Sequence, residues 1–185
     1  MPDMILLEAE EKMESRIDSL KREFSKVRTG RANPKLLDEV KVEYYGALTP
    51  IGQIGSISVP EPTQLLIKPY DRSIIKEVEK AILAANLGVN PNNEGEQLRI
   101  VIPALTTETR KQLAKDVKKH GEEMKIQIRN VRRDANDALK KLEKDHSISE
   151  DDSKGYQEDV QELTDKFITL IDTIVKDKEK DITSI

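Results

Sequence analysis

Six basic side chains between residues 118 and 140 have spacings that would place them on one side of an α-helix. At 100° per residue they fall within a stripe about 100° wide, centred about 130° from the apolar residues of the same segment. They are Lys118, Lys125, Arg129, Arg132, Arg133 and Lys140. Arginine offers a planar fork of donors that can hold two phosphate oxygens, so such a stripe could bind the backbone of duplex or structured RNA. Glu122 interrupts it.

The same six residues also suit a simpler interpretation. Because 36% of the residues are charged, basic side chains on a helix surface can pair with acids one turn away and simply solvate the helix. Taken alone, the stripe favours this solvated surface over an RNA site. Aromatic residues make up only 3% of the chain, so any RNA contact is expected to recognise shape and phosphates, not splayed bases.

The net charge of −4 conceals a separation of charge along the chain. Residues 105–148 carry twelve basic and eight acidic side chains, whereas residues 149–185 carry five basic and eleven acidic ones. A basic surface can therefore form locally on a protein that is acidic overall.

Few residues are suited to catalysis or to metal binding. The chain has no cysteine, and His120 and His146 are its only histidines. The absence of cysteine excludes thiol nucleophiles, disulfides and thiolate metal sites. Two histidines give little support for a histidine metal cluster or a Ser–His triad. Acidic pairs such as Asp151 and Asp152 occur by chance in so charged a chain and suit the start of a helix. We expect a protein that is not an enzyme and that holds no cofactor and no metal.

Three segments repeat apolar residues at alternating steps of three and four. The first extends from Leu6 to Val27, the second from Val117 to Leu142, and the third from Tyr156 to Ile174. A period of 3.5 held this long predicts helices that pack together in a left-handed bundle. Glu, Lys, Leu and Ala fill many of the remaining positions, which also favours helix.

Residues at the ends of these segments indicate the helix boundaries. Gly30 predicts that the first helix ends at residues 29–30, with the glycine as its C-terminal cap. The second helix is expected to begin at residue 106 or 107 and to extend for about 39 residues. Ser149 and Asp152 have the spacing of a capping box, which predicts the start of the third helix.

Residues 31–104 interrupt the helical pattern with Gly, Pro and short apolar runs. Short strands are expected at residues 40–44, 54–59, 65–67 and 98–102. Alternating apolar and charged residues in the first of them are typical of a half-buried strand. A helix that begins at Asp71 or Ser73 is expected to end near Gly88, before a turn at residues 90–93. This insert is predicted to be a small α+β domain.

The order of these elements predicts a mixed α and α+β fold with two domains. Residues 1–30 and 105–185 would form a discontinuous three-helix bundle, and residues 31–104 a small inserted domain. Because the chain leaves the bundle once and returns once, the two connections would act as a two-strand hinge. The expected hinge residues are Thr29, Gly30, Arg31, Pro103, Ala104 and Leu105.

No segment approaches the ~18 consecutive apolar residues that a membrane-spanning helix needs. The short apolar run near the N-terminus is followed by acidic residues and not by a cleavage site. We therefore expect a soluble, cytosolic protein that does not bind a membrane.

Five motifs resemble the bacterial ribosome recycling factor family. They are VRTGRANP at residues 27–34, VEYYG at 42–46, KPYDRS at 68–73, NVRRDAND at 130–137 and ISEDD at 148–152. The resemblance keeps the same order along nearly the whole chain, and the length agrees. The C-terminal sequence KEKDITSI departs slightly, with Thr183 where the family often has Met.

The resemblance implies a role after translation termination. Members of the family bind the ribosome while messenger RNA and a deacylated transfer RNA remain on it, and split it into subunits with elongation factor G and its GTP hydrolysis. The family fold is an L, in which a three-helix bundle is joined by a flexible hinge to a smaller α/β domain. The expected partners are therefore large-subunit ribosomal RNA and elongation factor G, which would push on the insert, and the chain is expected to be a monomer.

The resemblance also implies which residues contact RNA. Arg129, Arg132 and Arg133 would face large-subunit ribosomal RNA, with Arg132 as the strongest single candidate. Lys118, Lys125 and Arg110 complete the expected RNA-binding set. Residues 147–152, between the second and third helices, would form the far tip of the three-helix bundle.

A coiled-coil adaptor or chaperone that clasps a protein partner is the competing hypothesis. It explains the heptad spacing and the high charge, but not the single compact insert or the outward arginines. It predicts dependence on the apolar residues or the helix ends, and indifference to RNA.

Overall fold

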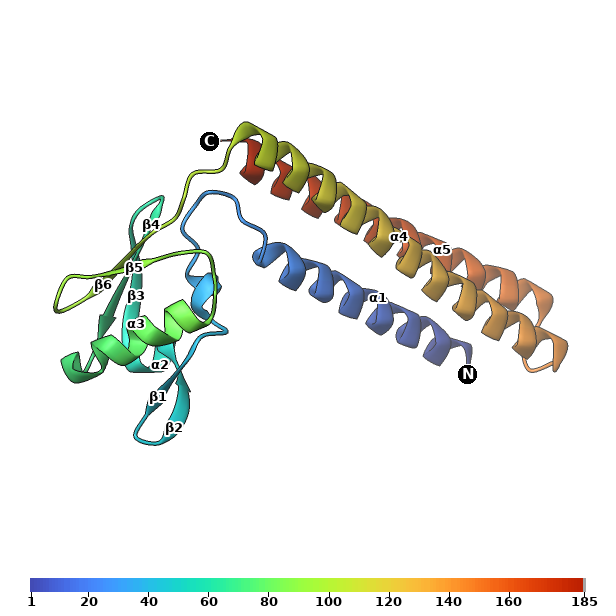
Figure 1. Ribbon diagram of the computed structural model, residues 1–185. Helices are drawn as coiled ribbons and strands as arrows, with labels where there is room; N and C mark the ends of the chain where they lie inside the picture. The colour runs from blue at the N-terminus through green and yellow to red at the C-terminus, as the bar shows by residue number, and fades with distance from the viewer. Residues whose placement is uncertain (185) are drawn as a thin grey trace. The chain divides into compact units, whose positions relative to one another are not determined.

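The computed structural model describes residues 1–184, which form two compact units (Figure 1). The helical unit comprises Met1–Val27 and Arg110–Ser184, and the small unit comprises Arg28–Thr109. Ile185, the last residue of the expected bundle domain, lies outside the described residues. Within residues 1–184, no helix is long and apolar enough to cross a membrane.

The helical unit contains the three predicted helices, α1 (Pro2–Ser25), α4 (Thr107–Lys144) and α5 (Glu150–Thr183). One continuous apolar core lies between them. Its fully buried residues include Met13, Leu20, Ile128, Leu139 and Ile171. The bundle predicted from the heptad spacing is therefore confirmed. Burial of these apolar residues is the main force that holds three such polar helices together.

The buried positions drift from a strict heptad toward the C-terminal ends of α4 and α5. In α4, Leu139 is buried, whereas Ala138 and Leu142, which continue the 3.5-residue spacing from Ala135, are only half-buried. In α5, the 3.5-residue spacing from Tyr156 leads to Leu170, but the neighbouring Ile171 is the buried residue. The apolar side of a helix with 3.6 residues per turn drifts by about 20° per heptad from a 3.5 repeat. The residue at a neighbouring position therefore becomes the one that faces the core.

Side-chain caps fix the starts of α4 and α5 as the sequence predicted. The Thr109 N–H donates to Oγ1 of Thr106, 3.1 Å away, just before α4. At the start of α5, the Asp152 N–H donates to Oγ of Ser149 at 3.0 Å, and the Ser149 N–H donates to the Asp152 carboxylate at 3.4 Å. Both halves of the capping box are thus present. His146, with φ of 54°, turns the chain between the two helices.

The first helix ends at Ser25, before the predicted end at residues 29–30. The N–H groups of residues 26 and 27 bond to carbonyls three residues back, which tightens and closes the last turn. The Arg28 guanidinium donates to the carbonyl oxygen of Leu87 at 2.5 Å, so Arg28 already belongs to the small unit. Gly30 has φ of 79° but lies in the connection and does not cap the helix.

The small unit consists of two antiparallel sheets, one α-helix of ten residues and several shorter helical turns. Its elements are η1 (Pro34–Leu37), β1 (Lys41–Tyr44), β2 (Ala47–Pro50), α2 (Ile51–Ile54), β3 (Gly55–Glu61), β4 (Gln64–Pro69), η2 (Arg72–Ile74), α3 (Ile75–Ala84), β5 (Pro91–Asn93) and β6 (Leu98–Val101). Strands β1 and β2 form a hairpin, and the larger sheet has the order β3-β4-β6-β5. The predicted α+β character of the insert is confirmed.

Alternate residues of the larger sheet and one side of α3 form the core of the small unit. Leu65, Ile67, Leu98 and Ile100 are fully buried, as are Val78 and Ile82 of α3. The Ser73 N–H donates to the Asp71 carboxylate at 2.9 Å, so Asp71 caps η2, the short helix that leads directly into α3.

Three features of the small unit differ from the sequence prediction. Strand β2, which pairs with β1, was not predicted. Residues 91–93, which were predicted to lie in a turn, form β5 because their backbone pairs with β6. Helix α3 ends at Ala84, before the predicted end near Gly88. Gly88 has φ of 71°, so it reverses the chain beyond the helix without capping it.

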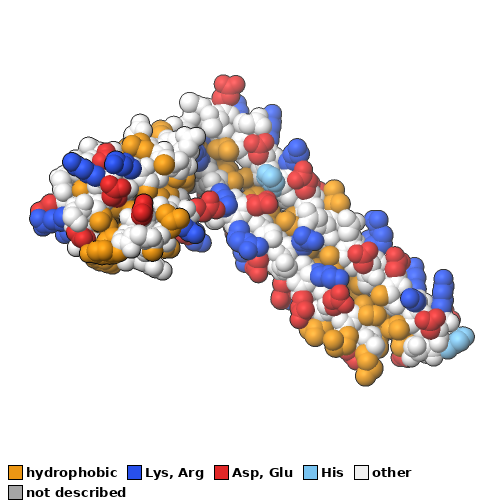
Figure 2. Space-filling view, turned by 60° about the horizontal axis from the view of Figure 1, so that its bottom comes forward, with side chains coloured by type: hydrophobic (Ala, Val, Ile, Leu, Met, Phe, Trp, Pro, Cys, Tyr) orange, Lys and Arg blue, Asp and Glu red, His pale blue; other side chains and the backbone are white. Residues whose placement is uncertain are grey.

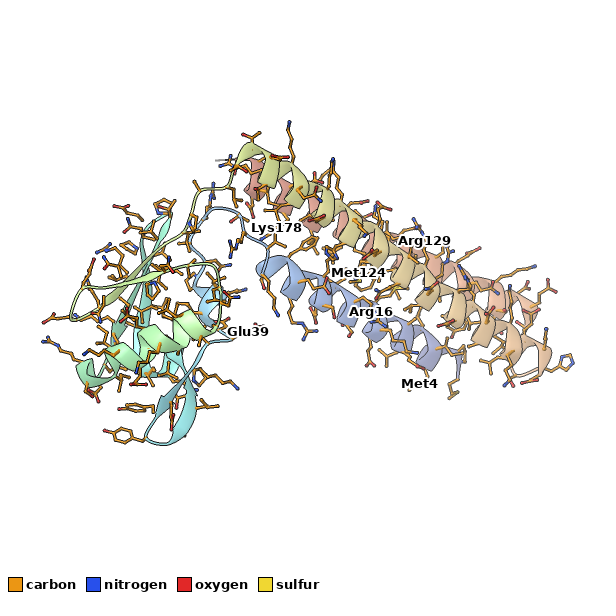
Figure 3. The ribbon with its side chains drawn as sticks, viewed as in Figure 1. Met4, Arg16, Glu39, Met124, Arg129 and Lys178 are labelled. Carbon is orange, nitrogen blue, oxygen red and sulfur yellow. The ribbon has the colours of Figure 1, made fainter. Side chains whose placement is uncertain are left out.

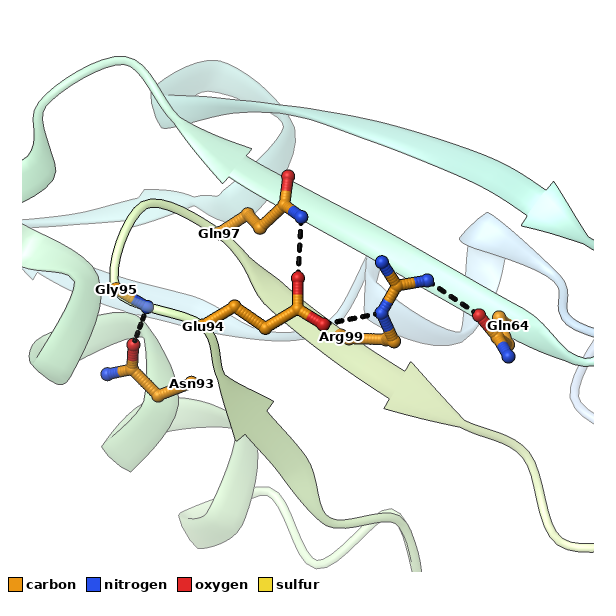
Figure 4. A network of polar contacts seen from close by, with 6 residues as sticks. All are labelled: Gln64, Asn93, Glu94, Gly95, Gln97 and Arg99. Carbon is orange, nitrogen blue, oxygen red and sulfur yellow. Dashed lines mark hydrogen bonds and ion pairs between the residues drawn. The ribbon is translucent and has the colours of Figure 1, made fainter.

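A polar network holds β6 against its two neighbours (Figure 4). Arg99 on β6 binds the Glu94 carboxylate at 2.6 Å and donates to Oε1 of Gln64 on β4 at 2.7 Å. The hydrogen bonds from Arg99 and then from Gln97 lower the pKa of Glu94. A depressed pKa means that Glu94 stabilises the folded state at neutral pH and that this contribution is lost as the pH falls through its folded value.

A glycine allows α4 and α5 to approach closely. Gly121 of α4 is buried, and a Cβ at this position would lie 2.5 Å from Cγ2 of Val175 on α5. Valine is stiff at χ1, so it cannot easily turn away. The spacing between the two helices at this level therefore depends on the missing side chain.

Replacing Gly121 by alanine is expected to destabilise the helical unit by about 1–2 kcal/mol, although alanine is the better helix former. The double variant Gly121→Ala/Val175→Ala is expected to recover part of the loss. Gly155→Ala on α5 is the matched control, because nothing lies within 4 Å of its Cβ position, and it is expected to stabilise by about 0.5–1 kcal/mol. Urea unfolding of the four proteins measures these differences, and a stabilising Gly121→Ala would contradict the packing argument.

Candidate nucleic-acid interface

The α4 basic stripe consists of Lys118, Lys125, Arg129, Arg132, Arg133 and Lys140, all of which lie on α4 as predicted. The side of α4 that carries Met124 is buried in the bundle. Arg129 lies on the side of α4 away from α1, whereas Met124 lies between the two helices (Figure 3). Acidic and basic side chains are interspersed along the helical unit, so the free cations must be identified residue by residue (Figure 2).

The N-terminal half of the stripe is neutralised by acids of α5. Lys125 binds the carboxylate of Asp172 at 2.5 Å and that of Glu122 at 3.1 Å, and its side chain is only 14% exposed. The hydrogen bond with Asp172 raises the pKa of Lys125, while burial acts in the opposite direction. Lys118 lies 3.7 Å from the carboxylate of Glu179. These two lysines therefore already have partners within the bundle.

Arg132 has an uncharged partner. Its Nη1 donates to Oε1 of Gln161 on α5 at 3.0 Å, and Nε2 of Gln161 donates to the Asp165 carboxylate at 2.9 Å. Arg132 is partly buried, whereas Gln161 is exposed. The guanidinium is thus fixed in position at the edge of α5 and keeps its positive charge.

The C-terminal half of the stripe carries the free cations. Arg129, Arg133 and Lys140 are exposed. None of the three forms a hydrogen bond or an ion pair with any residue between 1 and 184. With the oriented Arg132, these residues form a basic surface about three helical turns long that can bind phosphate oxygens.

Arg110 is placed differently from the other expected RNA-binding residues. It is half-buried near the start of α4, and its spacing of seven from Val117 places both residues on one side of the helix. That side is the buried one, because Val117 is only 1% exposed. Arg110 is therefore separated from the outward stripe.

The groove between α4 and α5 near Gly121 has a volume of about 550 Å³. It is lined by Lys118, Gly121, Glu122, Lys125, Asp172, Val175, Lys176 and Glu179. Its three lysines are balanced by three acids, so it offers no net attraction for an anion. The acidic excess of residues 149–185 was visible in the sequence, but its partners on α4 were not.

The expected hinge residues lie in two connections without helix or strand. Both connections are fixed at the small unit to the same turn between β3 and β4. The Ala32 N–H donates to the carbonyl oxygen of Pro62 at 2.7 Å, and the Ile102 N–H donates to that of Thr63 at 2.8 Å. At the other side of the first connection, Val27 packs against the core of the helical unit.

No cluster of three or more His, Cys, Asp or Glu residues within the described chain, residues 1–184, is arranged to hold a metal ion. The α4 basic stripe consists of helix-borne cations, whose chemistry suits phosphate oxygens.

Curated relatives resemble the chain over its whole length. The ribosome-recycling factor of Bacillus subtilis is 55% identical over 185 residues, which cover 100% of both chains. That of Brevibacillus brevis is 53% identical over the same span of both chains.

Solved structures also resemble the chain over nearly its whole length. A solution structure of the ribosome recycling factor matches with a TM-score of 0.83 and 40% identity, covering 100% of this chain and 98% of the other. A second match, with a TM-score of 0.67, 41% identity and 98% coverage of each chain, contains models for the T. thermophilus ribosome recycling factor and E. coli elongation factor G bound to the E. coli post-termination complex.

The family model described as ribosome recycling factor matches residues 20–183. This span includes all of α4 and α5, the whole small unit and both connections. The chain belongs to the ribosome recycling factor family.

Proposed function

We propose that this protein binds the post-termination ribosome and, together with elongation factor G, splits it into subunits, releasing messenger RNA and deacylated transfer RNA. The observation that carries the proposal is the 55% identity to a ribosome-recycling factor over the full length of both chains. In this role the protein is a monomeric translation factor of the cytoplasm and not an enzyme, because GTP hydrolysis belongs to elongation factor G. The family assignment replaces the adaptor hypothesis.

Large-subunit ribosomal RNA is the proposed contact of the α4 basic stripe. Arg129, Arg132 and Arg133 provide the main contacts with phosphate oxygens, and Lys140 adds to the local positive potential. Two properties of these residues support this assignment, namely exposure without an internal partner for Arg129 and Arg133, and fixed orientation for Arg132. Lys118 and Lys125 contribute less, because acids of α5 already neutralise them. Arg110 contributes least, because it is half-buried.

The two connections are the proposed hinge, which lets the small unit respond to elongation factor G. Residues 29–31 and 103–105 lie between backbone hydrogen bonds of the small unit and the packed ends of the helical unit. Gly30 already has φ of 79°, a region that glycine enters without steric cost. Pro103 has no N–H and so cannot extend the strand pairing of β6.

The proposed function is tested by sedimentation of purified post-termination ribosomes with this protein, elongation factor G and GTP. The wild type is expected to convert ribosomes to subunits. Arg132→Ala is expected to weaken ribosome binding by about 1–3 kcal/mol and to lower conversion at limiting protein, with the helix intact. Absence of conversion by the wild type, together with no comigration at low salt, would reject the function. Normal binding by the variant would remove Arg132 from the interface.

The two halves of the α4 basic stripe are expected to behave differently. Arg129→Ala should weaken ribosome binding by about 1–3 kcal/mol and reduce the slope of log K against log salt by about one. Lys125→Ala should change binding by less than about 0.5 kcal/mol and cost about 1 kcal/mol of stability, because its charge is paired and its stem is packed. Binding titrations at several salt concentrations and urea unfolding measure both. Equal losses of binding in Arg129→Ala and Lys125→Ala would contradict the expected difference between the two halves of the α4 basic stripe.

The hinge is tested by Gly30→Val. A β-branched residue disfavours the positive φ, so the variant is expected to bind ribosomes normally but to split them severalfold more slowly. Gly95→Val is the control, because Gly95 has φ of 92° in the small unit and nothing within 4 Å of its Cβ position. Normal splitting by Gly30→Val, or equal impairment by both variants, would remove Gly30 from the hinge.

A further inference from the structure

Four acids on α5 lie at intervals of seven residues and form one row along the helix. They are Glu158, Asp165, Asp172 and Glu179. Three bases on α4 have the same interval, Lys118, Lys125 and Arg132. A seven-residue interval returns to nearly the same side of a helix, so both sets form straight rows.

The first two bases pair with this row in a constant antiparallel register. Lys118 binds Glu179 at 3.7 Å, and seven residues further along α4 Lys125 binds Asp172 at 2.5 Å, seven residues earlier on α5. The next step of the same register pairs Arg132 with Asp165. A third ion pair at that level would neutralise Arg132 as the first two neutralise the lysines.

Gln161 occupies the place of that third ion pair. Its amide oxygen accepts from Nη1 of Arg132 at 3.0 Å, and its amide nitrogen donates to the Asp165 carboxylate at 2.9 Å. One neutral side chain therefore holds the base at one end and the acid at the other. Arg132 and Asp165 form no ion pair with each other or with any other residue from 1 to 184.

The choice of partner has consequences for what Arg132 can still bind. A carboxylate would cancel the guanidinium charge and could take two of its five N–H donors. An amide oxygen takes one donor and leaves the charge uncancelled. It also holds the guanidinium in one orientation, so less side-chain entropy is lost when a phosphate binds.

We propose that Gln161 is a positioning residue, which separates Arg132 from Asp165 and keeps the guanidinium charged and oriented for an RNA phosphate. This inference rests on the proposed function, since it assumes that Arg132 contacts ribosomal RNA. It adds a residue of α5, outside the basic stripe, to those that determine RNA affinity.

The test compares Gln161→Glu with the wild type in ribosome-binding titrations over a range of salt concentrations. The new carboxylate pairs with Arg132, so affinity is expected to fall about tenfold and the salt slope to decrease by about 0.9. The melting temperature is expected to stay the same or to rise, because the variant gains an ion pair. Gln157→Glu is the matched control, since it adds the same charge one turn away, where Gln157 contacts Ser153 and not Arg132.

A second pair of variants tests the separation directly. Gln161→Ala removes the spacer and allows Asp165 to pair with Arg132, so binding is expected to weaken. In Gln161→Ala/Asp165→Asn the acid is also neutralised, and binding is expected to recover most of the loss. Recovery would not occur if Gln161 only stabilised the contact between the helices. If Gln161→Glu does not fold, the comparison of Gln161→Ala with Gln161→Ala/Asp165→Asn provides the test.

Arg132→Ala in the same titrations separates this inference from the proposed function. If Arg132→Ala weakens binding while Gln161→Glu binds like the wild type, the inference is wrong and the RNA contact stands. Equal losses in Gln161→Glu and Gln157→Glu would also overturn it, because they would indicate a general charge effect. If Arg132→Ala binds like the wild type, both the RNA contact and the role of Gln161 are rejected.

Discussion

The register between α4 and α5 is the constraint on which the rest of this structure depends. It is set where Gly121 allows Val175 to approach, because any larger side chain at residue 121 would meet a stiff valine. In this register, acids of α5 neutralise Lys118 and Lys125, whereas Arg129 and Arg133 have no internal partner within residues 1–184. Packing in the core therefore decides which cations of the α4 basic stripe have a partner within the bundle and which do not.

The same bundle shows how a protein with a net charge of −4 can carry a locally basic surface. The excess of acidic over basic residues lies on α5, and two of these acids pair with lysines in the N-terminal half of the α4 basic stripe. Within the α4 basic stripe, the bases without an internal partner among residues 1–184 lie in the C-terminal half. Binding through a few phosphate contacts is sensitive to salt and reversible, which suits a factor that must leave the ribosome after each round.

Apolar periodicity and capping residues predicted much of the fold. The three helices, the capping box of Ser149 and Asp152, and the small α+β insert follow from local spacing. The early end of α1 did not follow from local spacing, and the hydrogen bond beyond it between Arg28 and the distant Leu87 is a tertiary contact that the sequence does not reveal. Likewise, the positions of Arg129 and Arg132 on one stripe follow from helical geometry, but their different partners depend on contacts with α5. Sequence spacing defines a surface, whereas tertiary contacts decide which of its charges are free.

A structure of this protein bound to a post-termination ribosome would test the central claim most directly. The account predicts ribosomal RNA phosphates within hydrogen-bonding distance of Arg129, Arg132 and Arg133, with Gln161 still bound to Arg132. It also predicts that Lys125 remains paired with Asp172 and makes no RNA contact. A complex in which α4 presents its arginines to solvent or to ribosomal protein, or in which Lys125 leaves Asp172 to bind RNA, would contradict it.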